Sequence, residues 1–358
     1  MSKPTHELHD LGQSLWLDNI TRDMLDDGTL AGYIDELSVT GLTSNPTIFD
    51  KAIGDGEDYD EQIAELRERG LEGDDLFFEL AITDLRRAAK LFEPVNERTA
   101  GVDGYVSLEV SPLLADEAEA TIAQVRELHA KADCNVFIKI PGTKSGQRAI
   151  EESIFAGIPI NVTLLFSTDQ YVGAAEAYMR GIERRIEAGL DPVVHSVASL
   201  FISRWDVAVA DAAPAELRNR LGIAVGKRTY RAYRELLDSP RSQRLANEGA
   251  RPQRLLWAST GTKDPDASDT LYIEAFAAPL TINTMPDKTL HAFADHGEVG
   301  ESMSPDGGDA EETLAAFAKA GIDTDELAER LQDEGAEAFV KSWRELLATI
   351  AEQRQAVA

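Results

Sequence analysis

The segment NVFIKIPGTKSGQRAIEESIFAGIPINVTLL, residues 135–165, contains two short apolar runs separated by a helical stretch. The first run is Asn135–Ile140, the helical stretch is Gly146–Ala156, and the second run is Pro159–Leu164. A strand, a helix and a second strand in this order form the unit from which parallel sheets are built. The segment therefore predicts an α/β fold.

The same alternation continues along most of the chain. Further strands are predicted at Ser14–Asp18, Gly41–Asn45, Tyr105–Val110, Val193–Phe201, Arg254–Ser259 and Leu280–Thr284. Further helices are predicted at Tyr59–Arg69, Asp75–Leu91, Leu113–Ala132, Asp169–Ala188, Ala215–Leu237 and, as one or two helices, Thr324–Gln353. Eight such strands, with no glycine-rich dinucleotide motif after the first, favour a closed barrel over an open doubly wound sheet. We expect a single (β/α)8 TIM barrel with additional helices, forming one domain over residues 1–358.

The composition restricts the partners of the protein. The formal net charge is −29, from 64 acidic and 35 basic residues. A surface of this sign repels nucleic-acid phosphates and anionic membranes, so neither is expected as a partner. It also repels phosphorylated metabolites, so a phosphate site must be built locally from a few basic groups. The acidic surface is also compatible with adaptation to salt.

The chain shows no targeting signal and no metal-binding pattern. It has no apolar stretch of roughly 20 residues and no signal-peptide core at its N-terminus, and Cys134 is its only cysteine. A cytoplasmic location is expected, because an internal disulfide is excluded. The six histidines do not cluster as ligands, so no metal site is predicted.

Lys139 occupies an unusual position in its predicted strand. Val136, Ile138 and Ile140 share one phase of the strand and suit the face toward the helices, whereas Phe137 and Lys139 share the other. Lys139 should therefore point into the barrel near the end of its strand, where barrel enzymes have their active sites. Lysine is almost never buried unpaired. It could pair with an inward carboxylate that stabilises the barrel, or it could supply a desolvated neutral amine for Schiff-base chemistry.

Polar residues also occupy the inward phase near the ends of neighbouring strands. They are Asp18, Asn45, Glu109, Asn161 and Thr163. Together with Lys139 they come from five strands, and a convergent set of this kind indicates a functional site more than a group of satisfied core residues.

Two of these residues have local alternatives. Asp18 could belong to the turn into the next helix, with Thr21 as the competing N-cap. Asn45 precedes Pro46 and could simply form a turn.

Four segments resemble the transaldolase family. They are Gly41-Leu-Thr-Ser-Asn-Pro-Thr-Ile-Phe49, Phe137-Ile-Lys-Ile-Pro-Gly-Thr-Lys-Ser-Gly146, Ile160-Asn-Val-Thr-Leu-Leu-Phe-Ser167 and Trp257-Ala-Ser-Thr-Gly-Thr-Lys263. The resemblance runs in unbroken order from about Leu11 to Thr284, and the last segment is similar to the phosphate side of the longer bacterial transaldolases.

The resemblance implies a role for each matching residue. Lys139 corresponds to the Schiff-base nucleophile, Asp18 to the acid/base at the bond that is broken, and Glu109 and Thr163 to the pair that holds the catalytic water. The implied substrate-binding residues are Thr43, Asn45, Asn161 and Ser199 around the three-carbon unit, Phe201 as an aromatic wall, and Arg204, Ser259 and Lys263 on the phosphate side.

The reaction implied by the resemblance is transfer of a dihydroxyacetone unit between sugar phosphates. The donor is sedoheptulose 7-phosphate or fructose 6-phosphate, and the acceptor is glyceraldehyde 3-phosphate or erythrose 4-phosphate. No cofactor is needed, because the iminium accepts the electrons of the cleaved bond. A monomer or a homodimer is expected.

The sequence departs from the family pattern on the phosphate side. Many relatives have a second arginine after the serine that corresponds to Ser259, whereas this chain has Thr260, Gly261, Thr262 and then Lys263. Lysine binds phosphate as a point charge and lacks the bidentate fork of arginine. The assignment of Ser259 and Lys263 therefore depends on position more than on chemistry.

Two other functions fit the same fold. A fructose-6-phosphate aldolase-like lyase would release the three-carbon unit, but that group uses a tyrosine to hold its water, so Glu109 and the chain length favour the transferase. A non-catalytic sugar-phosphate binding barrel would have little use for an interior lysine such as Lys139.

Overall fold

The computed structural model describes residues 3–353 and contains eight β-strands. The strands are β1 Ser14–Asp18, β2 Val39–Thr43, β3 Val106–Glu109, β4 Val136–Pro141, β5 Ile160–Leu165, β6 Ser196–Phe201, β7 Arg254–Ala258 and β8 Ile282–Met285.

The strands form a parallel barrel. Their order is β2-β1-β8-β7-β6-β5-β4-β3, and each neighbouring pair in this order is parallel. The ring is completed between β2 and β3, where the N–H of Gly104 donates to the carbonyl of Thr40 and the N–H of Leu42 donates to that of Tyr105, both at 2.9 Å. The predicted (β/α)8 fold is confirmed.

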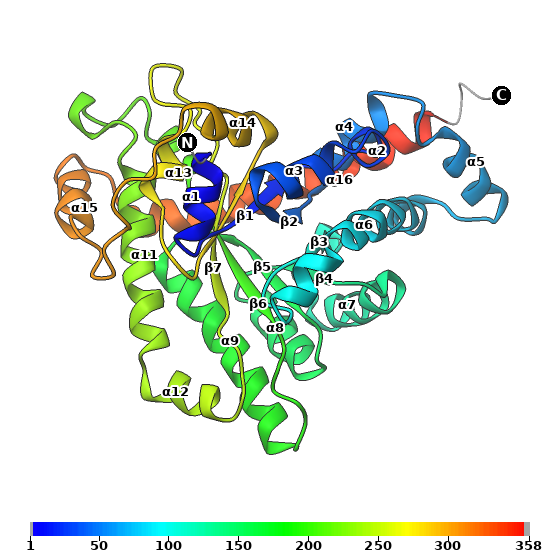
Figure 1. The fold of residues 1–358 in the computed structure, drawn as a ribbon, viewed down its shortest axis with the longest axis horizontal. Helices are drawn as coiled ribbons and strands as arrows, with labels where there is room; N and C mark the ends of the chain where they lie inside the picture. The colour runs from blue at the N-terminus through cyan, green and yellow to red at the C-terminus, as the bar shows by residue number, and fades with distance from the viewer. Residues whose placement is uncertain (1–2, 354–358) are drawn as a thin grey trace.

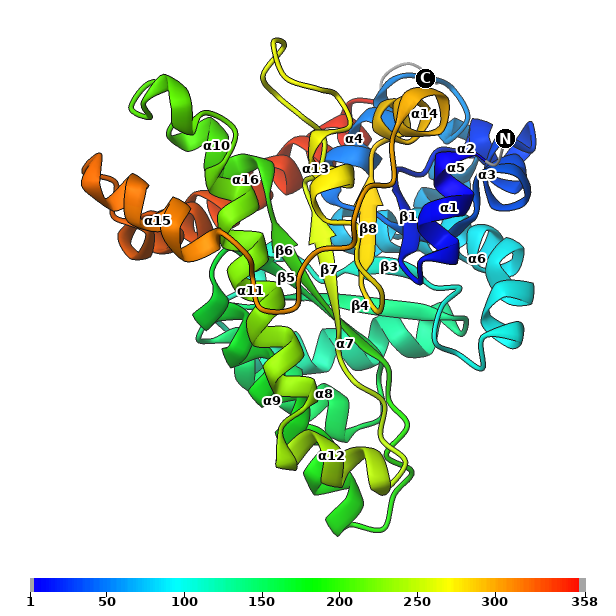
Figure 2. The same cartoon turned by 60° about the vertical axis from the view of Figure 1, so that its left-hand side comes forward.

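Helices cover the outside of the barrel and one of its ends (Figures 1 and 2). They are α1 Pro4–Asp10, α2 Arg22–Asp26, α3 Thr29–Leu37, α4 Pro46–Gly54, α5 Asp60–Glu68, α6 Gly73–Arg98, α7 Ala118–Ala132, α8 Gly146–Phe155, α9 Thr168–Glu187, α10 Ser203–Ala208, α11 Leu221–Leu237, α12 Pro240–Asn247, α13 Leu271–Ala275, α14 Asp287–His296, α15 Ala310–Lys319 and α16 Thr324–Glu352, with 3-10 turns at Pro112–Leu114 and Ala215–Leu217. No helix between residues 3 and 353 has both the length and the apolar composition required to cross a bilayer.

Helix α16 is the longest helix in the described chain, with 29 residues. It packs along α4, and its Trp343 contacts Phe77 of α6 edge to face at 5.0 Å between ring centroids. In the middle of α16 the side chain of Gln332 donates to the carbonyl of Leu164 in β5 at 2.8 Å. The helix therefore lies across the carboxyl ends of the strands.

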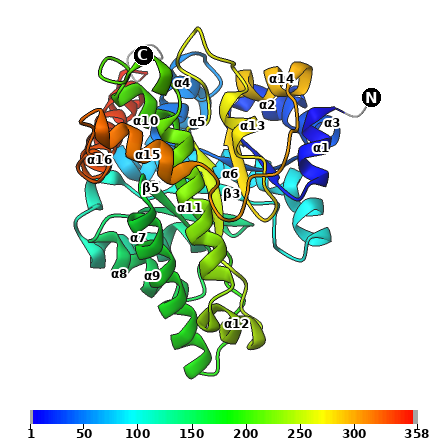
Figure 3. The same ribbon diagram turned by 90° about the vertical axis from the view of Figure 1, so that its left-hand side faces the viewer.

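Figure 3 shows α12 at the far end of the molecule from α4 and α14.

Several predicted element boundaries were wrong, and two of them have a clear physical reason. Strand β2 begins and ends two residues earlier than predicted, because Pro46 starts α4 and Asn45 becomes its N-cap. The predicted helix Ala215–Leu237 is divided into a 3-10 turn and α11. Helix α11 begins at Leu221 because the buried carboxylate of Asp206 accepts the backbone N–H groups of Leu221 and Gly222.

The predicted inward and outward phases hold in β4 but change within β5. Val136, Ile138 and Ile140 pack in the cluster shared with the surrounding helices, as expected. Strict alternation with the inward residues Asn161 and Thr163 would place Leu164 on this outer side, and that expectation was wrong. Leu164 has φ +58°, and the β5–β6 register shifts between Val162 and Leu165. A bulge inserts one residue, so Leu164 joins the inner cluster and Leu165 takes the outer position.

The amino-terminal end of the barrel is held by Asp103. This buried carboxylate accepts hydrogen bonds from Nε1 of Trp16 at 2.7 Å, from Oγ1 of Thr40 at 2.9 Å and from the hydroxyl of Ser14. Asp103 therefore joins β1 and β2 to the residues just before β3. This contact stabilises the closure of the ring between β2 and β3, where backbone pairing is weakest.

We predict that Gly41→Ala destabilises the barrel. An ideal Cβ at Gly41 would lie 2.5 Å from Cε2 and Nε1 of Trp16, so the indole must shift and weaken its bond to Asp103. Overpacking of this kind costs about 1–3 kcal/mol, measurable by denaturant unfolding. Gly32→Ala in α3 is the control, because its Cβ meets no atom within 4 Å. Equal stability of Gly41→Ala and wild type would show that the indole is not confined.

Candidate active site

A pocket of about 780 Å³ opens at the carboxyl ends of the strands. Every strand except β3 contributes to its wall, together with α4, α14 and α16. The predicted site residues that line it are Asp18, Thr43, Asn45, Lys139, Thr163, Ser199, Phe201, Arg204, Ser259 and Lys263. Glu109 and Asn161, the other two predicted residues, lie behind this wall.

Lys139 is the most buried cation of the pocket, at 5% exposure. Its Nζ lies 3.1 Å from Oε2 of Glu109 and donates to the carbonyl of Ser44 at 3.0 Å. The ring centroid of Phe339, from α16, lies 5.9 Å from the same nitrogen. Lys139 is thus paired with an inward carboxylate, as expected for a pair that stabilises the barrel. The pair also borders a pocket that most of the other predicted site residues line.

Glu109 lies beside Lys139 because β3 and β4 pair in register at these two residues. Its Oε1 and the hydroxyl of Thr163 are both buried and have no hydrogen-bond partner within residues 3–353. Burial raises the pKa of Glu109, although Lys139 opposes the shift. A carboxyl group in this state can exchange protons closer to neutral pH than an exposed glutamate.

Asn161 continues the same row, opposite Lys139 in the β4–β5 register. It is fully buried, accepts a hydrogen bond from Oγ of Ser199 at 2.7 Å and donates to Oγ of Ser107 at 3.3 Å. In this structure Asn161 reaches the pocket only through Ser199.

Asp18 lies at the end of β1 and its carboxylate is available to the pocket. Thr21 provides the N-cap of α2, so the competing interpretation of Asp18 as part of that turn is wrong. Thr43 donates to Oδ1 of Asp18 at 2.7 Å. Burial raises the pKa of Asp18, opposed by the hydrogen bond from Thr43 and by the positive charge of Lys139.

Asn45 starts a helix and also lies in the wall of the pocket. Its side-chain oxygen accepts the N–H of Ile48 at 3.1 Å as the N-cap of α4. Other atoms of Asn45 line the pocket. Since the oxygen is used by the cap, the amide NH₂ is the group that remains for a ligand.

The far side of the pocket is suited to an anion. Arg204 and Lys263 both line it, and neither forms an ion pair with a carboxylate in the described part of the chain. The guanidinium carbon of Arg204 lies 5.2 Å from the ring centroid of Phe201, and burial lowers the pKa of Arg204. Ser259 adopts φ +56°, a conformation that costs energy outside glycine and is concentrated at functional sites.

The sequence interpretation did not identify Lys51, Lys288 and Phe339, which also line the pocket. The lysines come from α4 and α14 and add positive charge near its rim. Phe339 lies in an amphipathic helix far along the chain from the barrel strands, so no strand-end pattern could have indicated it.

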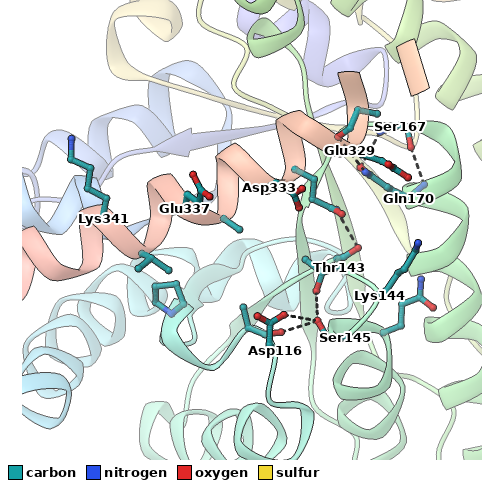
Figure 4. Close-up of a pocket in the computed structure, with 18 of the residues that line it drawn as sticks. Asp116, Thr143, Lys144, Ser145, Ser167, Gln170, Glu329, Asp333, Glu337 and Lys341 are labelled. Atoms are coloured by element: carbon teal, nitrogen blue, oxygen red, sulfur yellow. Dashed lines mark hydrogen bonds between the residues drawn. The ribbon is translucent and has the colours of Figure 1, made fainter. Parts of the chain in front are cut away.

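A larger groove, about 1,300 Å³, lies between α16 and the loops that follow β4 and β5 (Figure 4). Its carboxylates are Asp116, Asp169, Asp325, Glu329, Asp333, Glu337 and Glu345, against Lys144, Lys341 and Arg344. This excess of negative charge disfavours a phosphorylated ligand. The smaller pocket, which contains Lys139, is therefore the candidate active site.

Comparison with known proteins agrees with this geometry. A family model described as Transaldolase/Fructose-6-phosphate aldolase matches residues 15–350. The transaldolase of Parafrankia sp. (strain EAN1pec) is 46% identical over 363 residues, which cover 99% of this chain and 98% of that protein. The transaldolase of Thermobifida fusca (strain YX) is 44% identical, with 99% of each chain covered. That of Mycobacterium ulcerans (strain Agy99) is 45% identical, with 97% and 96% covered.

A (β/α)8 barrel with a lysine near the end of β4, in a pocket that Arg204 and Lys263 also line, defines the class of lysine-containing barrel enzymes. Within that class, the chain belongs to the transaldolase/fructose-6-phosphate aldolase family, because both the family model and the relatives cover nearly its whole length.

We predict that Asp18→Asn stabilises the fold above the pKa of Asp18. A carboxylic acid with a raised pKa favours folding most when protonated, and this contribution is lost as pH rises through the folded pKa. Asparagine removes the buried charge and can still accept the bond from Thr43. The free energy of unfolding of the variant should therefore exceed that of wild type at pH 8, with the difference shrinking toward pH 4.

Denaturant titrations at several pH values measure this difference. Asp10→Asn is the control, since Asp10 is exposed at the end of α1. A difference between Asp18→Asn and wild type that does not change with pH would contradict the prediction.

Proposed function

We propose that this chain is a transaldolase that carries a dihydroxyacetone unit on Lys139. The donor is sedoheptulose 7-phosphate or fructose 6-phosphate, and the acceptor is glyceraldehyde 3-phosphate or erythrose 4-phosphate, as in the non-oxidative pentose phosphate pathway. The observation that carries the proposal is the buried amine of Lys139, which borders the pocket at 3.1 Å from Glu109. The transaldolases that match almost the whole chain support an enzyme of the transferase class.

The first half of the reaction breaks a C–C bond. The neutral amine of Lys139 attacks the ketone carbon of the donor, and loss of water from the carbinolamine gives an iminium. The carboxylate of Asp18 takes the proton from the hydroxyl one carbon beyond the bond to be broken. The electrons of that C–C bond move into the iminium, so an aldose phosphate leaves and an enamine remains on Lys139.

The second half reverses these steps with a new aldehyde. The enamine carbon attacks the acceptor carbonyl, and Asp18 returns its proton to the new alkoxide. Water then adds to the iminium and releases the product and Lys139. Glu109 and Thr163, whose free polar atoms come from β3 and β5 on either side of β4, hold this water and pass its protons.

The remaining pocket residues hold the substrate. Thr43, Asn45, Ser199 and, through Ser199, Asn161 hydrogen-bond the hydroxyls of the three-carbon unit. Phe201 packs against the sugar chain, and Arg204, Ser259 and Lys263 bind the phosphate. The proposal needs no metal or organic cofactor, and it describes a cytoplasmic monomer or homodimer whose partners are small sugar phosphates.

The two alternatives differ in what they need for turnover. A lyase releases dihydroxyacetone without an acceptor, whereas a transferase turns over only when an acceptor aldehyde is present. A binding barrel turns over nothing and forms no covalent adduct. Glu109 at the position next to Lys139 favours the transferase, because the lyase group uses a tyrosine to hold its catalytic water.

We predict that Lys139→Ala lowers turnover by roughly 10³-fold or more, because the covalent route is lost. In wild type, incubation with fructose 6-phosphate followed by borohydride should attach a three-carbon group to Lys139, as mapped by mass spectrometry. Prior addition of erythrose 4-phosphate should reduce this trapping. Lys144→Ala is the matched control, because Lys144 follows the same strand but lines the other groove. An unmodified Lys139 in folded protein would overturn the mechanism.

We predict that Arg204→Ala raises KM for fructose 6-phosphate by roughly 10- to 100-fold, the range for losing hydrogen bonds to a charged group. Arg204→Lys should lose less, since it keeps the charge without the bidentate fork. Steady-state kinetics with fructose as the donor provide the control. Fructose has no phosphate, so its KM should be the same in wild type and variant. A similar rise in KM with both donors would contradict the prediction and show that Arg204 maintains the shape of the pocket instead of binding the phosphate.

A further inference from the structure

Strand β8 places one further threonine in the wall of the active-site pocket. Thr284 is 3% exposed and lines the pocket, but no step of the proposed reaction uses it. Its Oγ1 lies 2.6 Å from Oγ1 of Thr43, which in turn lies 2.7 Å from Oδ1 of Asp18. The side chain of Thr284 makes no other hydrogen bond within residues 3–353. The three residues therefore form one continuous chain of hydrogen bonds.

The barrel brings this chain together across β1. Asp18 and Thr43 are partners in the β1–β2 register, and β8 pairs with the other edge of β1. Thr284 lies opposite Trp16, which precedes Asp18 by two positions and shares its inward phase. The two threonines thus come from the strands on either side of β1 and meet inside the barrel.

The direction of each hydrogen bond follows from the number of protons available. A carboxylate only accepts, so the single hydroxyl proton of Thr43 points to Asp18 when Asp18 is ionised. Thr43 must then accept its second hydrogen bond from Thr284. Both hydroxyl dipoles point toward the negative charge, and linked hydrogen bonds of this kind strengthen one another.

The same chain distinguishes the two oxygens of Asp18. Oδ1 accepts from Thr43, whereas Oδ2 accepts no hydrogen bond in the described part of the chain. If Thr43 turned its proton toward Thr284, Asp18 would lose the only hydrogen-bond donor that the described residues provide. The proton of Thr284 prevents this rotation, because two hydroxyl protons cannot point at each other across 2.6 Å.

We propose that Thr284 is a positioning residue for the acid/base group of this site. Its hydroxyl donates to Thr43 and thereby holds the proton of Thr43 on Asp18, which keeps Asp18 an ionised base with Oδ2 free for the substrate hydroxyl. Thr284 acts through Thr43 and has no need to touch the substrate. The assignment rests on the proposed function, in which Asp18 takes a proton in the first half-reaction and returns it in the second.

Other groups also act on Asp18 and must stay constant in a test. Burial raises the pKa of Asp18, and charges from four other parts of the barrel modify it. The charged groups are Lys139 on β4, Lys263 after β7, Asp287 on α14 and Glu109 on β3. A substitution at Thr284 changes none of them, so a change in the pKa of Asp18 reports on the hydroxyl chain.

The test compares two variants of Thr284 in the full-length protein. Thr284→Val keeps the shape of the side chain and removes the hydroxyl, whereas Thr284→Ser keeps the hydroxyl. The measurement is kcat/KM for fructose 6-phosphate, with erythrose 4-phosphate as acceptor, as a function of pH.

We expect the acid limb of this profile to move to higher pH in Thr284→Val, because the ionised form of Asp18 loses stabilisation. On the acid limb the loss should be roughly two- to tenfold, the range for one neutral hydrogen bond, and it should disappear at higher pH where Asp18 is ionised in both proteins. Thr284→Ser should remain within about twofold of wild type at every pH. Thr289→Val is the matched control, because Thr289 is also buried but does not line the pocket.

A double-mutant cycle in unfolding gives a second readout that does not depend on turnover. At pH 8, Thr284→Val should lower the denaturant midpoint more in wild type than in Asp18→Asn, because only wild type has a charge at the end of the chain. This difference should shrink toward pH 4 as Asp18 becomes protonated.

Three results would overturn the proposal. One is a pH profile of Thr284→Val that matches wild type. Another is a loss of equal size at every pH, or an equal loss in Thr284→Ser, which would assign Thr284 to the shape of the pocket. The third is an equal change of the denaturant midpoint in wild type and Asp18→Asn at pH 8.

The transaldolase proposal fails by a different observation. If Thr284→Val has a wild-type pH profile and still forms the borohydride-trapped adduct on Lys139, only the role of Thr284 is lost. If wild type forms no adduct, the transaldolase proposal is lost, and the unfolding cycle still decides whether Thr284 and Asp18 are coupled.

Discussion

The buried ion pair between Lys139 and Glu109 depends on the register of two parallel strands. Removing either charge from water costs several kcal/mol unless the partner is held close. The β3–β4 ladder places both residues opposite each other in the inward phase, and Asn161 continues the row on β5. A shift of one residue would turn Lys139 toward the apolar helix layer. The closed, parallel barrel is thus the condition for having an amine in this position.

Positive side chains lie around the pocket that contains Lys139, whereas the chain as a whole carries a negative charge. The chain as a whole is strongly acidic, yet Arg204, Lys263, Lys51 and Lys288 gather around the pocket. The neighbouring groove across α16 has the opposite character. The pocket also contains the carboxylates of Asp18, Asp23, Asp55, Asp58 and Asp287, so attraction of a phosphate depends on the local position of Arg204 and Lys263. Screening by salt would weaken the repulsion from the remaining surface.

The fold and half of the candidate site could be predicted from local periodicity, whereas the other candidate residues were implied only by the family resemblance: Thr43, Ser199, Phe201, Arg204, Ser259 and Lys263. Alternation along residues 135–141 gave the orientation of Lys139, and strand ends gave Asp18 and Glu109. What could not be predicted depends on contacts between distant segments. The bulge at Leu164 is stabilised by Gln332 of α16, and the start of α11 is set by Asp206. Phe339 enters the pocket from a helix that carries no strand-end signal.

Helix α16 has a consequence for the order in which the molecule is made. All eight strands precede it in the chain, so the ribosome completes the barrel sequence before the helix that lies across its mouth. Chains fold largely from the N-terminus onward during synthesis. The nascent barrel therefore exists for a time with Lys139 uncovered by Phe339. The helix that brings Phe339 over Lys139 is translated after all eight strands, so the pocket is completed only once the barrel sequence has been made.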